Sequence, residues 1–162
     1  MKEAAAEILT KAKAQGVMIA TAESCTGGMV AAALTDIAGS SAIFDRGFVT
    51  YTNAAKMQML GVTNASLDAY GAVSEQVAIE MALGAIAHSA AQIAVSITGI
   101  AGPGGSDHKP EGRVCFGLAS GGACRAETVE FGALGRANVR QAARDHALHL
   151  LLSSLDSVAP KI

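Results

Sequence analysis

The chain has 162 residues, of which 51% are hydrophobic, and a formal net charge of −2, so it is long enough for one domain with a buried core. The balanced charge argues against binding nucleic acid through a basic surface, and no apolar run approaches the ~20 residues that cross a bilayer. Cys25, Cys115 and Cys124 lack the spacing of metal ligands, and no cleavable hydrophobic segment begins the chain, which predicts a cytoplasmic protein.

Helical and strand patterns alternate without repeats or low-complexity linkers, and residues 1–162 are therefore expected to form a single domain. Gly16 is expected to end the first helix, and Ser74 to cap the helix that runs to His88. In chain order, the sequence predicts a helix over 2–15, a strand over 17–22, a helix over 27–37, a strand over 43–51, helices over 53–60, 64–70 and 74–88, a strand over 92–98, strands over 113–119 and 124–131, and a helix over 135–155.

Buried strands that are joined through helices indicate a layered α/β fold with a largely parallel sheet. The strands over 113–119 and 124–131 are joined by Ser120-Gly121-Gly122-Ala123, which predicts a hairpin and makes the sheet mixed. Two glycine-rich turns directly follow strands, at the edge where open α/β sheets bind ligands. Residues 106–111 are expected to form a solvated loop.

The first of these turns is Ala22-Glu23-Ser24-Cys25-Thr26-Gly27-Gly28, between a strand and a helix. Its backbone N–H groups suit an anion or a carbonyl oxygen that becomes one. Ser24 can act there as a helix N-cap, the commoner role of serine at such a position, or as a nucleophile with a nearby base. Cys25 is a competing nucleophile, because a helix N-terminus favours the thiolate, although no histidine has an evident partner role.

Lys56 is the candidate base for Ser24. It falls in the first turn of the helix over 53–60, for which Asn53 is the expected N-cap, and the helix dipole and partial burial lower the pKa of a lysine at that end. A neutral lysine can take a proton from serine; the alternative is a solvated surface lysine. Tyr51 closes the preceding strand, where it either relays protons and orients the amine or only packs at the strand end.

The second turn runs from Thr98 to Gly105 as Thr-Gly-Ile-Ala-Gly-Pro-Gly-Gly. It is either a tight strand-to-loop transition or a backbone cradle for a phosphate or a substrate carbonyl. No Gly-Lys-Ser/Thr follows it, and no dinucleotide-binding glycine pattern opens a helix, so neither nucleotide hydrolysis nor hydride transfer is indicated.

The final helix carries two groups of side chains that could bind ligands. Arg136, Arg140 and Arg144 recur every four residues, either as a solvated basic face or as the source of one phosphate-binding arginine. His146 and His149 superficially resemble a metal pair but lack a third ligand, so they are expected to be helix-surface histidines.

Together these motifs resemble the CinA C-terminal domain family, from about residue 5 to residue 155. The matching blocks are Ala22 to Gly28, Gly39-Ser40-Ser41, Tyr51 to Lys56, Gly71-Ala72-Val73-Ser74, Thr98 to Gly102 with Pro103, and Pro110-x-Gly112. The resemblance implies a three-layer α/β/α sandwich. It also implies hydrolysis of the carboxamide of nicotinamide mononucleotide to nicotinate mononucleotide and ammonia, in pyridine nucleotide recycling.

The resemblance implies roles for individual residues, with Ser24 as nucleophile, Lys56 as its base and Tyr51 as an assisting catalytic group. Arg140 matches the C-terminal arginine of the family. The substrate-binding residues that it implies are Cys25, Thr26, Gly27, Gly28, Thr98, Gly99, Ala101, Gly102, Arg136 and Arg140. No metal or organic cofactor is expected, and the expected partners are a small nucleotide substrate and other copies of the chain in a homo-oligomer, without nucleic acid or membrane.

The sequence departs from the family pattern at two places. Where Pro-Val-Gly-Thr-Val is common, the chain has Pro110-Glu111-Gly112-Arg113-Val114, and Gly135 replaces the usual acidic residue before the first arginine of the final helix. Both changes bear on how a phosphate is held. The alternative function is a non-catalytic nucleotide- or partner-binding module linked to competence and DNA damage, but the sequence offers no basic patch or aromatic platform for nucleic acid.

Overall fold

The computed structural model describes residues 1–106 and 108–157. Its helices are α1 (Lys2–Gln15), α2 (Met29–Thr35), α3 (Asn53–Leu60), α4 (Asn64–Tyr70), α5 (Glu75–Ala87) and α6 (Arg136–Asp156), with a 3₁₀ turn, η1 (Ser40–Ala42). Its strands are β1 (Ile19–Glu23), β2 (Phe44–Val49), β3 (Ile93–Gly99), β4 (Arg113–Ser120) and β5 (Ala123–Glu130). Each helix and strand expected from the sequence is present, and Gly16 and Ser74 cap their helices as expected. None of the described helices combines the length and apolar composition needed to cross a membrane.

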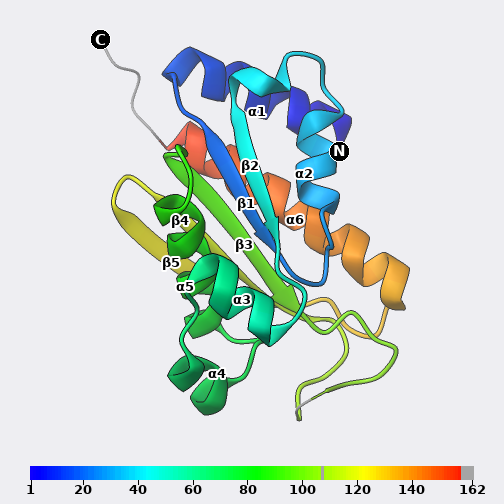
Figure 1. Cartoon of the computed structure of the whole chain (residues 1–162). Helices are drawn as coiled ribbons and strands as arrows, with labels where there is room; N and C mark the ends of the chain where they lie inside the picture. Colours follow the sequence, from blue (N-terminus) through cyan, green and yellow to red (C-terminus); the bar gives the residue numbers. More distant parts are fainter. Residues whose placement is uncertain (107, 158–162) are drawn as a thin grey trace.

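The strands form one sheet in the order β2-β1-β3-β4-β5 (Figure 1). β1 runs parallel to both β2 and β3, and the β4–β5 hairpin adds antiparallel strands on the other side of β3. The expected mixed sheet, parallel at its centre, is therefore confirmed. The two glycine-rich turns follow β1 and β3, which are parallel neighbours, so both turns lie at the same edge of the sheet.

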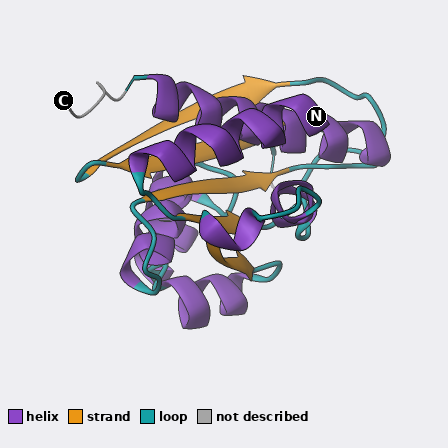
Figure 2. Cartoon of the chain, turned by 90° about the horizontal axis from the view of Figure 1, so that it is seen from above, coloured by secondary structure: helices purple, strands orange, loops and turns teal. Residues whose placement is uncertain are grey.

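Helices cover both faces of the sheet and give the expected three-layer sandwich (Figures 1 and 2). On one face, α1, α2 and α6 bury aliphatic side chains such as Ile8, Val30 and Leu151 against the sheet. On the other face, α3, α4 and α5 form a second core that includes Leu60 and Met81. Burial of these aliphatic groups on both faces is the main force that holds the turns in place.

The start of α2 and the N-cap of α3 differ from the predictions. α2 begins at Met29 rather than at residue 27, because Gly27 and Gly28 adopt φ angles of 57° and 103°, which a right-handed helix does not contain. Thr52, not Asn53, caps α3, since its hydroxyl accepts the backbone N–H three residues further on, at 3.1 Å. Both corrections concern the segments that carry the candidate nucleophile and base.

Candidate active site

Ser24 directly follows β1, where the carboxyl ends of the three parallel strands meet. Its backbone N–H donates to the carbonyl of Ile97 on β3 at 2.9 Å, and the N–H of Thr50 donates to the carbonyl of Glu23 at 2.8 Å. Strand pairing on both sides thus fixes the backbone at the nucleophile position. Because rigid backbone holds reactive groups more accurately than a free loop, this is a suitable place for a catalytic serine.

Lys56 reaches Ser24 from the first turn of α3. Its Nζ lies 3.0 Å from the Ser24 Oγ, and its side chain is buried, with 1% of the residue exposed. The interpretation as a solvated surface lysine is therefore wrong. The two side chains lie within the distance that proton transfer from a nucleophile to its base requires.

Burial of the Lys56 amine increases the fraction that is neutral. Burial lowers the pKa of Lys56 from its ordinary 10.5 to about 8, so that about one Lys56 in ten is neutral at pH 7. The other neighbours of Nζ are the carbonyl oxygens of Thr50 at 3.0 Å and Tyr51 at 3.4 Å, which can only accept hydrogen bonds. In the structure Nζ donates to Ser24 Oγ as well as to these carbonyls. A neutral amine keeps two N–H groups for the carbonyls and has one lone pair that can accept from the Ser24 hydroxyl instead.

Glu23 is a residue of this turn whose role the sequence did not indicate. Its buried carboxylate accepts hydrogen bonds from Val30 N–H at 2.9 Å, from Ala31 N–H at 3.0 Å and from the Thr26 hydroxyl at 2.7 Å. Glu23 therefore caps α2, and the interpretation of Ser24 as the N-cap is wrong. The N-terminal N–H groups of α2 are already occupied by this carboxylate, so they do not form the predicted site for a substrate anion.

Cys25 is next to Ser24 but is poorly suited to act as a nucleophile. Burial raises the pKa of the Cys25 thiol from 9.0 to about 11, and only the thiolate is strongly nucleophilic. The competing interpretation based on the helix N-terminus overlooked this burial, which outweighs the dipole. Cys25 packs into the core beneath the turn.

A cavity of about 310 Å³ opens above Ser24 and Lys56. The predicted site residues that line it are Ser24, Cys25, Tyr51, Lys56, Thr98, Gly99, Ala101, Gly102 and Arg136. Thr26, Gly27, Gly28 and Arg140 do not line it. Among the described residues of its lining, Lys56 and Arg136 are basic and none is acidic, so the cavity suits an anionic ligand.

The two predicted arginines have different contacts. Arg140 donates from Nε to the carbonyl of Cys25 at 3.0 Å and from Nη2 to that of Thr26 at 3.5 Å, and therefore ties the nucleophile turn to α6. Arg136 donates to the Gly102 carbonyl at 2.7 Å and to the Tyr51 hydroxyl at 2.6 Å. Of the stripe of arginines on α6, the one at its N-terminal end thus faces the cavity.

Tyr51 contributes to the cavity through two different groups. Its backbone carbonyl accepts from Lys56, while its exposed phenol hydroxyl accepts from Arg136. The phenol thus lies toward the mouth of the cavity, next to α6. Any assistance of Tyr51 to Lys56 that the structure describes comes from the backbone, and a proton relay through the phenol stays a prediction.

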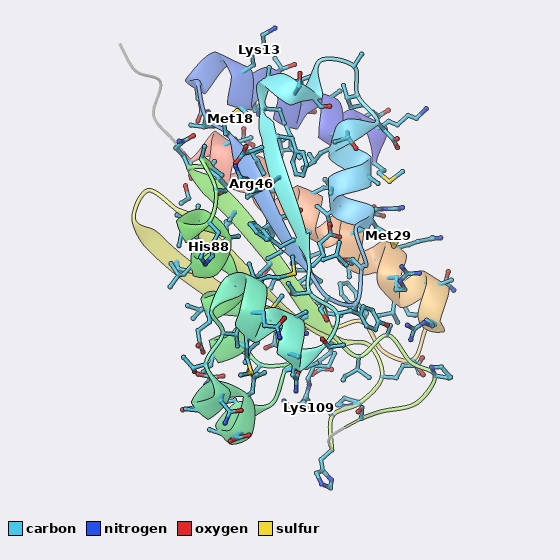
Figure 3. The ribbon with its side chains drawn as sticks, in the orientation of Figure 1. Lys13, Met18, Met29, Arg46, His88 and Lys109 are labelled. Atoms are coloured by element: carbon cyan, nitrogen blue, oxygen red, sulfur yellow. The ribbon has the colours of Figure 1, made fainter. Side chains whose placement is uncertain are left out.

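The end of β3 and the loop that follows it form one wall of the cavity and are anchored at several points. Thr98 donates from its hydroxyl to the carbonyl of Ala72 at 2.9 Å. Lys109 donates from Nζ to the carbonyls of Tyr70 at 2.7 Å and Val73 at 2.5 Å (Figure 3). The predicted solvated loop is therefore tied to the α4–α5 connection, although Ser106, His108 and Pro110 are exposed.

His146 and His149 lie away from the cavity. The His146 Nε2 is 2.6 Å from the Glu127 carboxylate, and its ring packs on Phe116 with centroids 4.5 Å apart. Within residues 1–106 and 108–157, no group of three His, Cys, Asp or Glu side chains is arranged to hold a metal ion. His146 therefore takes part in the packing of α6 against the β4–β5 hairpin, and His149 is exposed on the surface of α6, as expected from the sequence.

Comparisons with known proteins agree with this fold. The chain is 59% identical over 120 residues to a protein of Enterobacter agglomerans named nicotinamide-nucleotide amidohydrolase PncC, a match that covers 74% of this chain and 73% of the relative. It is 61% identical over 109 residues to the protein of the same name from Escherichia coli K12, which covers 67% and 66% of the two chains. The crystal structure of competence/damage inducible protein CihA from Agrobacterium tumefaciens superposes with a TM-score of 0.92 at 49% identity, over 96% of this chain and 95% of that one. The model of the CinA C-terminal domain matches residues 1–155, and the chain belongs to this family.

Proposed function

We propose that the protein hydrolyses the carboxamide of nicotinamide mononucleotide, giving nicotinate mononucleotide and ammonia, through an acyl-enzyme on Ser24. The observation that carries the proposal is the buried contact of 3.0 Å between Lys56 Nζ and Ser24 Oγ, at the floor of a cavity that suits an anion. The substrate is supported by the relatives named nicotinamide-nucleotide amidohydrolase, at about 60% identity.

In the first half of the reaction, the lone pair of neutral Lys56 takes the proton of the Ser24 hydroxyl while Oγ bonds to the carboxamide carbon. The negative charge that develops on the carbonyl oxygen needs N–H donors. In the turn that follows Ser24, the Gly27 N–H already donates to the Ser24 carbonyl at 3.0 Å. Among the described residues, the N–H groups of Cys25, Thr26 and Gly28 have no such acceptor, and that of Cys25, next to the nucleophile, is the proposed oxyanion donor.

In the second half, protonated Lys56 returns its proton to the carboxamide nitrogen, the C–N bond breaks and ammonia leaves. A water molecule then attacks the acyl carbon while Lys56 takes its proton, and Lys56 passes that proton to Ser24 Oγ as the bond between Oγ and the acyl carbon breaks. The product leaves as the acid, which ionises to the carboxylate in water. The steps balance without a metal, an organic cofactor or an oxidant. Lys56 alternates between two charge states, which its position among two carbonyls and one hydroxyl accommodates.

We assign the phosphate of the substrate to Arg136. Two of its five N–H groups are used in contacts with Gly102 and Tyr51, which leaves three to bind an anion at the cavity mouth. Arg140, the family arginine, contacts the nucleophile turn, and we assign it the role of holding that turn. Thr98 and the glycines that follow it line the space between Lys56 and Arg136, where the ribose and pyridinium ring would lie.

An ammonia-release assay on three compounds tests the function. The protein should release ammonia fastest from nicotinamide mononucleotide, more slowly from nicotinamide riboside, which lacks the phosphate, and least from free nicotinamide. Arg136→Ala should raise the KM for the mononucleotide about tenfold and leave the riboside reaction unchanged, because a bidentate contact to phosphate is lost. Arg144→Ala, on the same helix and paired with Asp145, is the matched control.

The outcomes of this assay separate the candidate functions. Saturable binding of the mononucleotide without ammonia release contradicts the proposal and supports the non-catalytic binding module. Equal release from carboxamides without a ribose phosphate supports an amidase with another substrate.

We further propose that residues 1–162 act as one amidohydrolase domain in the cytoplasm, in pyridine nucleotide recycling. We also propose that the protein is a homo-oligomer, and chromatography with light scattering would test this oligomeric state.

A further inference from the structure

Glu111 links the cavity wall to the start of α6. Its Oε1 accepts a hydrogen bond from the Gly104 N–H at 2.7 Å, and its Oε2 accepts one from the Gly135 N–H at 3.2 Å. Gly104 lines the cavity, and Gly135 is the N-cap of α6, directly before Arg136. The carboxylate of Glu111 therefore joins the loop that encloses the cavity to the residue directly before Arg136, which faces the cavity.

The segments that Glu111 joins have little conformational restraint of their own. Gly102, Gly104 and Gly135 adopt φ angles of 90°, 76° and 92°, and glycine backbone of this kind moves freely unless contacts fix it. A Cβ placed on Gly102 would lie 2.5 Å from the Glu111 carboxyl carbon, so the carboxyl group packs directly on the loop. Arg136 closes a ring of contacts by donating to the Gly102 carbonyl at 2.7 Å.

The charge of Glu111 also suits its position at the N-terminus of α6. The N-cap of this helix is a glycine without a side-chain hydrogen bond, and a negative charge at that end stabilises a helix. Through its hydrogen bond with the Gly135 N–H, Glu111 places its negative charge at this end of α6.

We propose that Glu111 is a positioning residue that holds the Gly102–Gly105 wall and Arg136 in the arrangement that receives the anionic end of the substrate. It acts through backbone N–H groups and Arg136, not by touching the reacting atoms. The proposal rests on the proposed function where it concerns the phosphate. The hold of Glu111 on the loop and on α6 is a separate claim and can be measured without any substrate.

The kinetic test compares Glu111→Val and Glu111→Gln with wild type on nicotinamide mononucleotide and on nicotinamide riboside. Valine removes both acceptors, and we expect the KM for the mononucleotide to rise about tenfold with kcat within about threefold, while the KM for the riboside, which lacks the phosphate, rises by less than about threefold. Glutamine keeps one acceptor and should give an intermediate KM. The control is Glu3→Gln, which removes an exposed carboxylate from the first turn of α1 and should leave both reactions unchanged.

Amide hydrogen exchange of Gly104 and Gly135, followed by NMR, provides the test that needs no substrate. Both amides should exchange at least about tenfold faster in Glu111→Val than in Glu3→Gln, since each loses its acceptor. The proposal is overturned if both amides of Glu111→Val exchange at wild-type rates, if kcat/KM falls equally for the mononucleotide and the riboside, or if only kcat falls. If wild type releases no ammonia, the proposed function fails, and the exchange rates still decide whether Glu111 holds the loop and α6.

Discussion

Replacing Ser24 with alanine should abolish ammonia release and leave the fold intact. The substitution removes the atom that bonds to the carboxamide carbon, and loss of a serine nucleophile lowers kcat by at least about 10⁴-fold in serine hydrolases. Ser24 does not cap α2, since Glu23 supplies that contact, so the free energy of unfolding should change by less than about 1 kcal/mol. Ammonia release and urea denaturation measure the two effects.

Cys25→Ala is the matched control for this variant, because it removes the neighbouring candidate nucleophile. The buried thiol has a raised pKa and makes no contact with Lys56 Nζ among the hydrogen bonds of the described residues. We expect its kcat to remain within about threefold of wild type, even if stability falls by about 1 kcal/mol for the lost packing. If Cys25 were the nucleophile, Cys25→Ala would lose activity and Ser24→Ala would keep it. Activity in Ser24→Ala contradicts the assigned role of Ser24.

Replacing Lys56 with methionine should also lower kcat by at least about 10⁴-fold, because no other described side chain next to Ser24 can accept its proton. In wild type, kcat/KM should rise as the pH increases toward about 8, as Lys56 loses its proton. Methionine retains the unbranched apolar stem of the side chain, so the loss of activity reports the missing amine. Activity close to wild type in this variant would rule out Lys56 as the base.

The same substitution should change how stability depends on pH. The pKa of Lys56 is about 8 when folded and 10.5 ordinarily, so the unfolded chain binds more protons between these values, and wild-type stability rises with pH across that window. Below about pH 8 the buried amine is charged, so the free-energy cost of its burial lowers the stability of wild type in full. Between pH 7 and pH 9.5, wild type should gain about 2 kcal/mol relative to Lys56→Met.

Urea denaturation at the two pH values measures this difference. The exposed Lys13 near the end of α1 provides a control, because Lys13→Met should keep a constant difference from wild type. A constant difference for Lys56→Met as well would show that the folded protein does not perturb Lys56, and would remove the physical basis for its action as a base.

The layered fold could be predicted from the sequence because its signals are local. Apolar runs such as residues 92–98, the glycines after them, and the hairpin at Gly121-Gly122 each specify a strand or turn without reference to the rest of the chain. The same information made Lys56 a candidate neighbour of Ser24, since parallel strands place their carboxyl ends together, but it left a solvated surface lysine as the alternative. The motif resemblance then added the roles of these residues and the implied substrate.

Other features of the site depend on contacts between distant segments and could not be read from the sequence. A carboxylate that precedes a helix by several residues, as Glu23 does, caps it only because the intervening glycines fold the turn back on itself. The stripe of arginines on α6 did not indicate that Arg136 faces the cavity while Arg140 holds the nucleophile turn. The burial that keeps Cys25 protonated likewise results from tertiary packing.

The most direct measurement is the identification of the residue that carries the acyl group during turnover. Enzyme mixed with nicotinamide mononucleotide is quenched in acid within the first turnovers, and its peptides are analysed by mass spectrometry. Parallel reactions contain hydroxylamine, which intercepts an acyl-enzyme even when hydrolysis is fast. The dyad of Ser24 and Lys56 predicts the acyl group on Ser24 and a hydroxamate product in place of part of the acid. An acyl group on Cys25 or another residue, or an unmodified Ser24 with no hydroxamate while ammonia is released, would contradict it.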